Sequence, residues 1–429
     1  MRRFAVLSGS AVFLGLASWA IAARAYPKPE PSVADARDLA VRCEEAVADA
    51  RPQVPHRADL ELEPGVAFGN DESHALGRVL GVAWDGVRLH VLDGTSGLAV
   101  YDTLGHRLSG YAGIGEGPGE LWEQSGLHGS RGGYNQIASL DDGYVIVHGR
   151  DRLHLFDPSG AYIHRVSRGA EVDGLFAVRH VAPIDGSRAA VARTGAMASF
   201  RADSLLRPER QLIEVAVATD QGLAIRPLAY AYDRHSGDRP LGRYPARGPY
   251  DSWTRRLWDA NEGILTVVPL TAAGVCYFRV DDLALASAVR LGVRPIPVDR
   301  RERRRVIDEL RERSQRVPMT GESWEDYFGF WPPYLPISLD VVMGTGTVTW
   351  IERAASADRR VVDLYHPERG YLGTTELPFD GLPLGFDDRC GYVVTMEPQG
   401  RIAADEPFYG LQRWCPANEI NGFEGEEQQ

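Results

Sequence analysis

A short signal that recurs along the chain constrains the fold more than any other feature of the sequence. A residue pair ending in glycine is followed at once by a hydrophobic, strand-like run. The six pairs are Asp85-Gly86, Asp142-Gly143, Asp185-Gly186, Glu262-Gly263, Thr345-Gly346 and Cys390-Gly391. Glycine supplies the positive φ that tight hairpin turns need, and alternating β-branched and aromatic residues are typical of half-buried strands. The recurrence predicts an all-β chain built from repeated hairpins.

Two successive copies of this signal align without a gap. Residues 89–108 (LHVLDGTSGLAVYDTLGHRL) match residues 144–163 (YVIVHGRDRLHLFDPSGAYI), and both predict a strand, a turn, a strand, a turn and a third strand. A repeat of roughly 40–50 residues is typical of propeller blades. We therefore expect a six-bladed β-propeller with four-stranded antiparallel blades. Closing such a ring requires its ends to share a blade, and residues 60–69 are the predicted outer strand of the last blade.

The N-terminal residues have the pattern of an export segment. Residues 1–25 combine a basic start, Arg2 and Arg3, with an apolar run and the small-residue pattern Ala23-Arg24-Ala25. This pattern predicts a signal peptide, and the length of the apolar run leaves an uncleaved membrane anchor as the alternative. Either outcome predicts an extracytoplasmic location in a bacterium: periplasmic, secreted or membrane-tethered.

The rest of the chain divides by composition. Residues 26–57 predict a Pro-rich linker and a short amphipathic helix that acts as a spacer or cap. The propeller is expected over residues 58–416, with a helical and aromatic insertion at 295–336 between the fourth and fifth blades. Residues 417–429 predict a disordered acidic tail.

The charge and motif content exclude several function classes. The net charge of −12 argues against a nucleic-acid partner, because a basic face supplies most of the affinity for phosphate backbones. Lys28 is the only lysine in the sequence, so the body of the chain has none for Schiff-base chemistry or a P-loop. No G-x-S-x-G nucleophile elbow is present. We expect a monomer whose partner is an unknown protein or small-molecule ligand.

One stretch resembles a known family. Residues 101–127 (YDTLGHRLSGYAGIGEGPGELWEQSGL) are similar to the end of a blade in the bacterial six-bladed β-propeller proteins, a group near the NHL-repeat propellers. The matching residues are Tyr101, Asp102, Gly105, Gly115, Glu116, Gly117, Pro118, Gly119, Glu120 and Leu121. The resemblance implies a propeller fold and export, and it implies no particular activity.

The Gly-rich loop in this stretch is predicted to be a structural crossover between blades. A phosphate cradle is disfavoured, because the loop carries two carboxylates and no helix is expected to follow it. The residues of this structural loop are Gly115, Gly117, Pro118, Gly119 and Glu120, and Glu120 is placed to accept backbone N–H bonds.

Acidic turn residues and cysteines give weaker signals. Asp85, Asp141 and Asp185 are the candidates for a Ca²⁺ site near one face, since hard cations want several oxygen ligands. Aspartate is also common in hairpin turns for local reasons, so we expect no cofactor. Among the four cysteines, Cys390 and Cys415 both fall in the last blade and are the predicted disulfide. A Cys43–Cys276 pair is the alternative, with Cys276 otherwise a buried small hydrophobe.

The insertion contains the best candidate for a recognition surface. Its Arg-rich helix, residues 299–316, is predicted either to be a solvated face with pairs such as Glu309–Arg313 or to meet an anionic partner. Aromatic residues, which are over-used at recognition surfaces, follow it: Trp324, Tyr327, Phe330, Trp331 and Tyr334. We predict a non-catalytic binding or scaffold module. The alternative is a propeller hydrolase or lyase, resembling lactonases or esterases, with a metal in the central channel.

Overall fold

The computed structural model describes most of the chain beyond the N-terminal export segment. The described residues are 37–58, 60–69, 76–77, 79–115, 117–121, 137–140, 142–149, 152–167, 178–194, 209–234, 239–241, 244–246, 256–313, 331, 334–343, 348–354, 361–378, 383–387, 391–395, 400–403, 406–408 and 410–416. The predicted signal peptide or anchor (1–25) and the predicted acidic tail (417–429) lie outside them.

Most strands belong to sheets of four or five strands, numbered here in chain order. Sheet 1 consists of β4 (Val79–Trp84), β5 (Leu89–Asp93), β6 (Gly97–Tyr101) and β7 (Arg107–Tyr111). Sheet 2 consists of β8 (Ile137–Ser139), β9 (Val145–Gly149), β10 (Arg152–Phe156) and β11 (Tyr162–Ser167). In both sheets every neighbouring pair is antiparallel.

The next two sheets each gain a fifth strand from the N-terminal segment. Sheet 3 consists of β12 (Val178–Asp185), β13 (Arg188–Thr194), β14 (Glu209–Thr219) and β15 (Gly222–Arg234), with β1 (Arg37–Asp38) added at the edge. Sheet 4 consists of β18 (Trp258–Asn261), β19 (Ile264–Val267), β20 (Gly274–Arg279) and β21 (Leu285–Leu291), with β2 (Pro52–Gln53) at the edge. Both added strands are parallel to their neighbours.

The last two sheets again have four strands each. Sheet 5 consists of β22 (Ser338–Met343), β23 (Thr349–Arg353), β24 (Val361–His366) and β25 (Gly370–Glu376). Sheet 6 consists of β26 (Pro383–Asp387), β27 (Gly391–Thr395), β30 (Leu411–Pro416) and β3 (Leu62–Phe68). Two ribbons stand apart: β16 (Arg239–Leu241) with β17 (Tyr244–Ala246), and β28 (Gly400–Ala403) with β29 (Glu406–Phe408).

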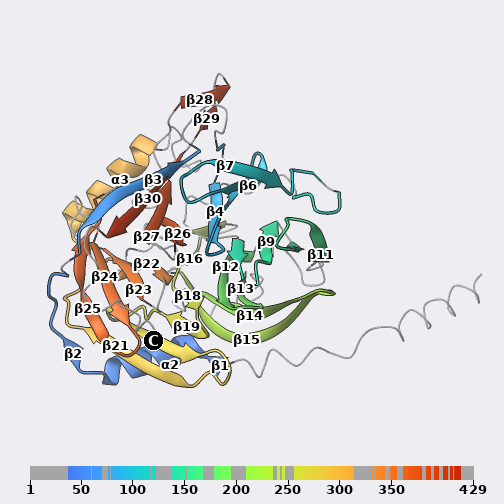
Figure 1. The fold of residues 1–429 in the computed structure, drawn as a ribbon. Helices are drawn as coiled ribbons and strands as arrows, with labels where there is room; N and C mark the ends of the chain where they lie inside the picture. The colour runs from blue at the N-terminus through green and yellow to red at the C-terminus, as the bar shows by residue number, and fades with distance from the viewer. Residues whose placement is uncertain are drawn as a thin grey trace, which may run out of the picture. The chain divides into compact units, whose positions relative to one another are not determined.

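The sheets form a closed ring, which makes the fold a β-propeller of antiparallel blades (Figure 1). The first strands of consecutive sheets contact one another in the order β4, β8, β12, β18, β22, β26 and back to β4. A separate hydrophobic cluster fills each junction between neighbouring sheets, including the junction of sheet 6 with sheet 1. The core is therefore spread around the ring, and each sheet is stabilised mainly by its two neighbours.

The repeated Gly signals fall between the first and second strands of their sheets. Gly86 lies between β4 and β5 with φ of 84°, and Gly143 lies between β8 and β9 with φ of 78°. A side chain at either position would be strained in this left-handed conformation. Asp185-Gly186 and Glu262-Gly263 mark the same turn in sheets 3 and 4. Gly391 begins β27, and Thr345, Gly346 and Cys390 lie outside the described residues. We call the end of the ring that carries these turns the turn face.

The longer connections between sheets lie at the opposite end. A four-stranded antiparallel sheet returns the chain to the end at which it entered, so each connection between sheets starts and finishes at that end. The connection from β21 to β22 contains helix α3 (Arg300–Arg313), as the sequence predicted. Val298 and Val306 pack on Leu335 and on Ala354, which follows β23. We call this end, where the first strands begin, the insertion face.

The N-terminal segment wraps the outer edges of sheets 3 to 6. After β1, helix α2 (Leu39–Asp49) packs on strands of sheets 3 and 4, and β2 follows on β21. Arg57 then pairs with Thr374 on the outer strand of sheet 5, and β3 pairs with β30. We call residues 37–68 the N-terminal belt. Its strands satisfy backbone groups that an outer edge would otherwise expose.

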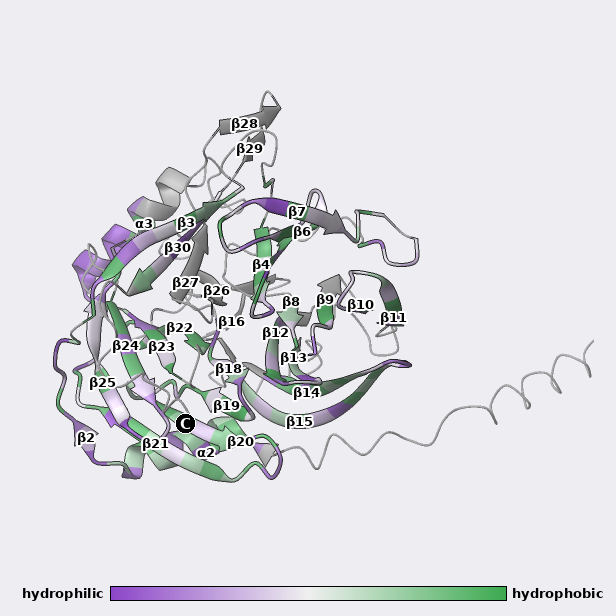
Figure 2. Cartoon of the chain, in the orientation of Figure 1, coloured by the Kyte–Doolittle hydropathy of each residue, from purple (hydrophilic) through white to green (hydrophobic). Residues whose placement is uncertain are grey.

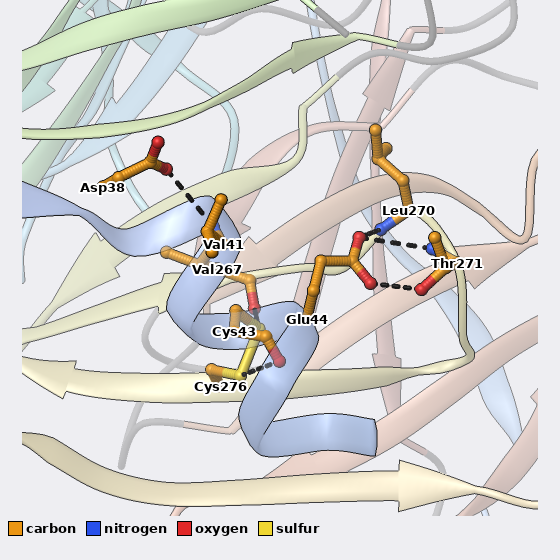
Figure 3. Close-up of a disulfide and its surroundings, with 8 residues drawn as sticks. All are labelled: Asp38, Val41, Cys43, Glu44, Val267, Leu270, Thr271 and Cys276. Carbon is orange, nitrogen blue, oxygen red and sulfur yellow. Dashed lines mark hydrogen bonds between the residues drawn. A yellow bond between two sulfur atoms is a disulfide. The ribbon is translucent and has the colours of Figure 1, made fainter. Parts of the chain in front are cut away.

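A disulfide fixes the belt to the ring. Cys43 of α2 is bonded to Cys276 of β20, with the two Cα atoms 5.6 Å apart (Figure 3). Next to it, the Glu44 carboxylate accepts a hydrogen bond of 2.6 Å from the backbone N–H of Leu270 and also bonds the Thr271 hydroxyl. Asp38 caps the start of the helix by accepting from the Val41 N–H.

These contacts change the interpretation of residues 26–57. The predicted amphipathic helix is confirmed, and Leu39, Ala40, Cys43 and Val47 form its buried face. The expectation of a linker is wrong for residues 37–57, because two strand segments and the disulfide tie them to the ring. The predicted closing strand is confirmed, since β3 lies within residues 60–69 and pairs with β30.

Removing the disulfide should destabilise the fold measurably. The bond closes a loop of 233 residues, so a Cys43→Ser/Cys276→Ser variant should lose about 2–5 kcal/mol of unfolding free energy. Urea denaturation followed by tryptophan fluorescence measures the loss. The Cys43→Ala/Cys276→Ala variant, which removes the same bond with a different side chain, is the matched control and should show the same loss. An unchanged denaturation midpoint in the variant would contradict the belt's stabilising role.

Candidate functional site

Buried ionisable side chains gather near the beginnings of the first strands of sheets 3, 4 and 5. His180 of β12 and Asp259 of β18 lie 3.1 Å apart, Nε2 to Oδ1. His180 is 2% exposed and Asp259 is 6% exposed. The His180 ring also meets the edge of Trp258 at 4.8 Å between centroids. The pair links neighbouring sheets through a hydrogen bond that is shielded from water, where an electrostatic contact is stronger.

The Asp259 carboxylate is held by further donors. Its Oδ1 accepts from the N–H of Ala260 at 2.9 Å, and its Oδ2 accepts from the N–H of Met343 at 2.9 Å. Met343 is the last residue of β22, so this carboxylate reaches sheets 3, 4 and 5. Such multiple hydrogen bonding stabilises a buried carboxylate.

A second buried contact joins sheets 4 and 5. Arg256, just before β18, donates from Nε to Asp340 Oδ1 at 2.7 Å and from Nη2 to Oδ2 at 2.9 Å. Both side chains are only 1% exposed. The two inter-sheet links, Arg256 to Asp340 and Asp259 to Met343, have the same sequence offset of 84 residues. The constant offset means that β18 and β22, which lie next to each other, are parallel.

This arrangement holds sheets together, and it leaves one unused polar atom. His180 Nδ1 has no hydrogen-bond partner in the part of the chain that the structure describes. With Nε2–H donated to Asp259, Nδ1 carries the lone pair and is a base or a ligand atom. Aspartate–histidine pairs of this kind orient an imidazole for proton transfer. His180 is therefore the described side chain here best suited to acid–base chemistry.

The candidate Asp85 takes part in a structural cluster on the turn face. Its Oδ2 lies 2.9 Å from His90 Nε2 and accepts from Arg88 Nε at 2.8 Å. The other ring nitrogen, His90 Nδ1, lies 3.1 Å from the Tyr111 hydroxyl. Burial works to raise the pKa of Asp85, but hydrogen bonds from His90 and from the N–H groups of Arg88 and Val87 outweigh it, so the pKa lies well below its usual value.

The candidate Asp185 also binds an arginine of its own turn. Asp185 accepts from Arg188 Nε at 2.7 Å, which repeats the Asp-Gly-x-Arg contact of Asp85 and Arg88. Asp141 lies outside the described residues. Within the described ranges, no group of three or more His, Cys, Asp or Glu side chains is arranged to hold a metal ion. Asp85 and Asp185 thus stabilise their own turns by binding the arginine three residues later.

The Gly-rich loop closes on itself before the chain continues to sheet 2. Glu120 Oε2 accepts from the N–H of Gly117 at 2.7 Å, and Gly115 donates to the Leu121 carbonyl at 2.7 Å. Gly119 has φ of 78°, and an added Cβ would lie 2.9 Å from Tyr162. The N–H groups of Gly115, Gly117, Glu120 and Leu121 are therefore bonded within the loop.

The structure describes only part of the predicted aromatic surface. Trp331 lies under the Arg303 guanidinium, 5.6 Å from the ring centroid, and packs with the cluster around Val306. Tyr334 is 51% exposed. Trp324, Tyr327 and Phe330 lie outside the described residues, as does Cys390 of the predicted Cys390–Cys415 pair. Cys415 on β30 is disulfide-bonded, and its pairing with Cys390 stays a prediction.

Sequence reasoning missed the inter-sheet cluster. His180, Arg256, Asp259 and Asp340 come from three sheets and share no short motif. The signal that could have drawn attention to them is a charged residue within or just before a hydrophobic first strand, since buried charges need partners.

Comparisons with known proteins find only distant structural similarity. No protein-family model matches the chain, and no curated protein matches it. A candidate exported protein from Bacteroides fragilis is similar over 84% of this chain and 99% of its own, with 11% identity and a TM-score of 0.44. The WD40 domain of Neurospora crassa Pan2 is similar over 85% and 98%, with 10% identity and a TM-score of 0.39.

A third solved structure is an enzyme. The Xanthomonas campestris gluconolactonase is similar over 85% of this chain and 98% of its own, with 14% identity and a TM-score of 0.38. These similarities are too distant to carry an argument about activity. Neither of the two helices in the described residues has the length and apolar character of a membrane span.

The Arg256–Asp340 pair should show strong energetic coupling. Arg256→Met alone leaves a buried carboxylate without its partner and should cost about 3–5 kcal/mol of unfolding free energy. The double variant Arg256→Met/Asp340→Leu should cost clearly less than the sum of the single changes. Urea denaturation of the four proteins gives the coupling energy.

The exposed pair Arg279–Asp282 is the matched control for that cycle. Its side chains are 59% and 52% exposed, so its coupling should stay below about 1 kcal/mol. Additive losses at Arg256 and Asp340 would show that the pair does not link the sheets.

Asp85 should make stability depend on pH in a defined direction. Its folded-state pKa lies below the value of about 3.9 for an unfolded aspartate, so its contribution is complete above that pH and is lost as the pH falls. Asp85→Asn should therefore cost about 1–3 kcal/mol at pH 7, and the gap from wild type should narrow below about pH 4. Urea denaturation between pH 7 and pH 3 measures both. Asp142→Asn, at an exposed turn on the same face, is the control, and a gap that widens in acid would refute the assignment.

Proposed function

We propose that this chain is an extracytoplasmic, six-bladed β-propeller that acts as a binding or scaffold module through its insertion face. In this proposal, each of the six large sheets is one blade. The proposed location is supported by the export pattern of residues 1–25 and by the Cys43–Cys276 disulfide, because disulfides persist in oxidising compartments.

The observation that carries the binding role is how the buried charges between the first strands are used. Asp259 and Asp340 each bind N–H donors through both carboxylate oxygens. A carboxylate held in this way resists a change of partner, because breaking a buried pair is costly. In this proposal these carboxylates hold neighbouring sheets together, and the connections between sheets on the insertion face bind the ligand.

The insertion face has the general properties of a recognition surface. Loops carried on a rigid scaffold commonly bear binding residues, and all the connections between sheets meet at this end. There α3 presents exposed arginines. Tyr334 is half exposed, and its backbone pairs with Pro297, which precedes the helix. Aromatic and arginine side chains are enriched among residues that dominate binding energies.

The alternative function is a hydrolase or lyase that uses His180. The specific observation in its favour is the Asp259-bound imidazole with an unpartnered Nδ1. In that reading Asp259 positions the ring and His180 transfers a proton.

Initial rates of lactone and ester hydrolysis distinguish the two functions. The full chain is assayed with glucono-δ-lactone and p-nitrophenyl acetate, with and without added Ca²⁺, against buffer and a His180→Gln variant. A binding module should give the same rates as buffer, with or without Ca²⁺, and so should the variant. Turnover that falls at least about 100-fold in His180→Gln, the scale of a lost general base, would overturn the binding role and support the enzyme. His164→Gln, a change at a partly buried histidine of sheet 2, is the matched control.

A further inference from the structure

Helix α3 carries positive charge that the protein leaves uncompensated. Arg305 is neutralised by Glu302, with contacts of 2.6 and 3.0 Å, and Arg303 stacks over Trp331. Among the described residues, which include the helix side chains as far as Asp308, the exposed side chains of Arg300, Arg301 and Arg304 have no ion pair, hydrogen bond or ring contact. Figure 2 shows the start of this helix as one of the most hydrophilic parts of the chain.

The buried face of helix α3 is packed against the ring, which fixes the position of these arginines. Val306 and Ile307 are each 2% exposed, and Val298 before the helix is 5% exposed. The Val298 and Val306 side chains pack with Leu335 and Ala354 of the sheet 5 region. Asp299 caps the helix by accepting from the Glu302 N–H at 2.8 Å. The first-turn amide is thus occupied, and the guanidinium groups are what the helix offers to a ligand.

The spacing of the three arginines brings like charges together. Arg300 and Arg304 are four residues apart and Arg301 and Arg304 are three apart, so they are neighbours on one helix surface and repel one another. The repulsion occurs in a chain whose net charge is −12. A bound anion would remove it. The same three side chains border a shallow, open depression of the surface of about 370 Å³.

We propose that Arg300, Arg301 and Arg304 form a binding site for a soluble oligoanion with two or more phosphoryl groups. Guanidinium groups bind phosphate oxygens through paired hydrogen bonds, and three of them match more than one phosphoryl group. The inference rests on the proposed binding role of the insertion face and names its ligand class.

Calorimetry with inorganic tripolyphosphate tests the site on the full chain. Wild type should bind, and each single change, Arg300→Gln, Arg301→Gln or Arg304→Gln, should weaken binding about tenfold, the scale of one charge-assisted hydrogen bond. The triple variant should lose binding at least about 100-fold. Its circular dichroism spectrum and urea midpoint should match those of wild type, because the three exposed side chains have no ion pair or hydrogen bond with the described residues.

A matched triple variant separates a site from general electrostatics. Arg107→Gln/Arg226→Gln/Arg369→Gln removes three exposed arginines elsewhere and should leave the affinity within about twofold. Equal losses in both triple variants, or no tripolyphosphate binding by wild type, would overturn the proposal. Binding to vesicles containing anionic phospholipid without binding to tripolyphosphate would also overturn it. None of these outcomes depends on His180, so failure of the anion site is distinguishable from a catalytic result in the hydrolysis assay.

Discussion

The pairing of β3 with β30 is the interaction on which the rest of the structure depends. Each sheet is packed mainly against its two neighbours, so the ring is stable only if its last sheet is complete. Residues from opposite ends of the chain meet there, with Glu63 opposite Cys415 and Ala67 opposite Gln412. The Gln412 side chain adds a hydrogen bond of 2.8 Å to the Gly65 carbonyl. Without β3, the edge of β30 would be open to other chains.

The N-terminal belt places β3 next to β30, and polar side chains have different partners on the two faces of the ring. It covers outer edges of sheets 3 to 6 and is bonded to sheet 4 through Cys43 and Cys276. On the turn face, carboxylates such as Asp85 and Asp185 close their own hairpins. Between the first strands, Arg256, Asp259 and Asp340 join the sheets. Arg300, Arg301 and Arg304 of α3, at the insertion face, have no ion pair with any described residue.

The sequence predicts the elements whose signals are local. The glycine pairs mark the first hairpins because positive φ is a property of the turn itself. Residues 60–69 were predicted as the closing strand because a propeller needs one just outside the first repeat, and Leu39, Cys43 and Val47 reveal a helix through their 3.6-residue period. Hairpin physics accounts for an aspartate at the Asp85 turn, whereas no local signal in the sequence indicates its contact with His90.

Contacts between distant segments could not be predicted in this way. Cys43 pairs with Cys276 because α2 packs across sheets 3 and 4. The residues next to each cysteine in the sequence do not indicate this packing. The same holds for His180 with Asp259, which lie 79 residues apart. These partners are chosen by the geometry of neighbouring sheets. A single sequence indicates that a buried charged residue or a cysteine needs a partner, but it does not identify that partner.

Native-state amide hydrogen exchange of β3 and β30 tests ring closure by the belt most directly. If the account is right, the paired amides of β3 and β30 exchange only through global unfolding, at the rate of the first strands β12 and β22. Their protection should fall together as urea is added. Exchange of β3 at a free energy well below the global value, while β12 and β22 stay protected, would show that the ring is stable without its N-terminal strand and would contradict the account.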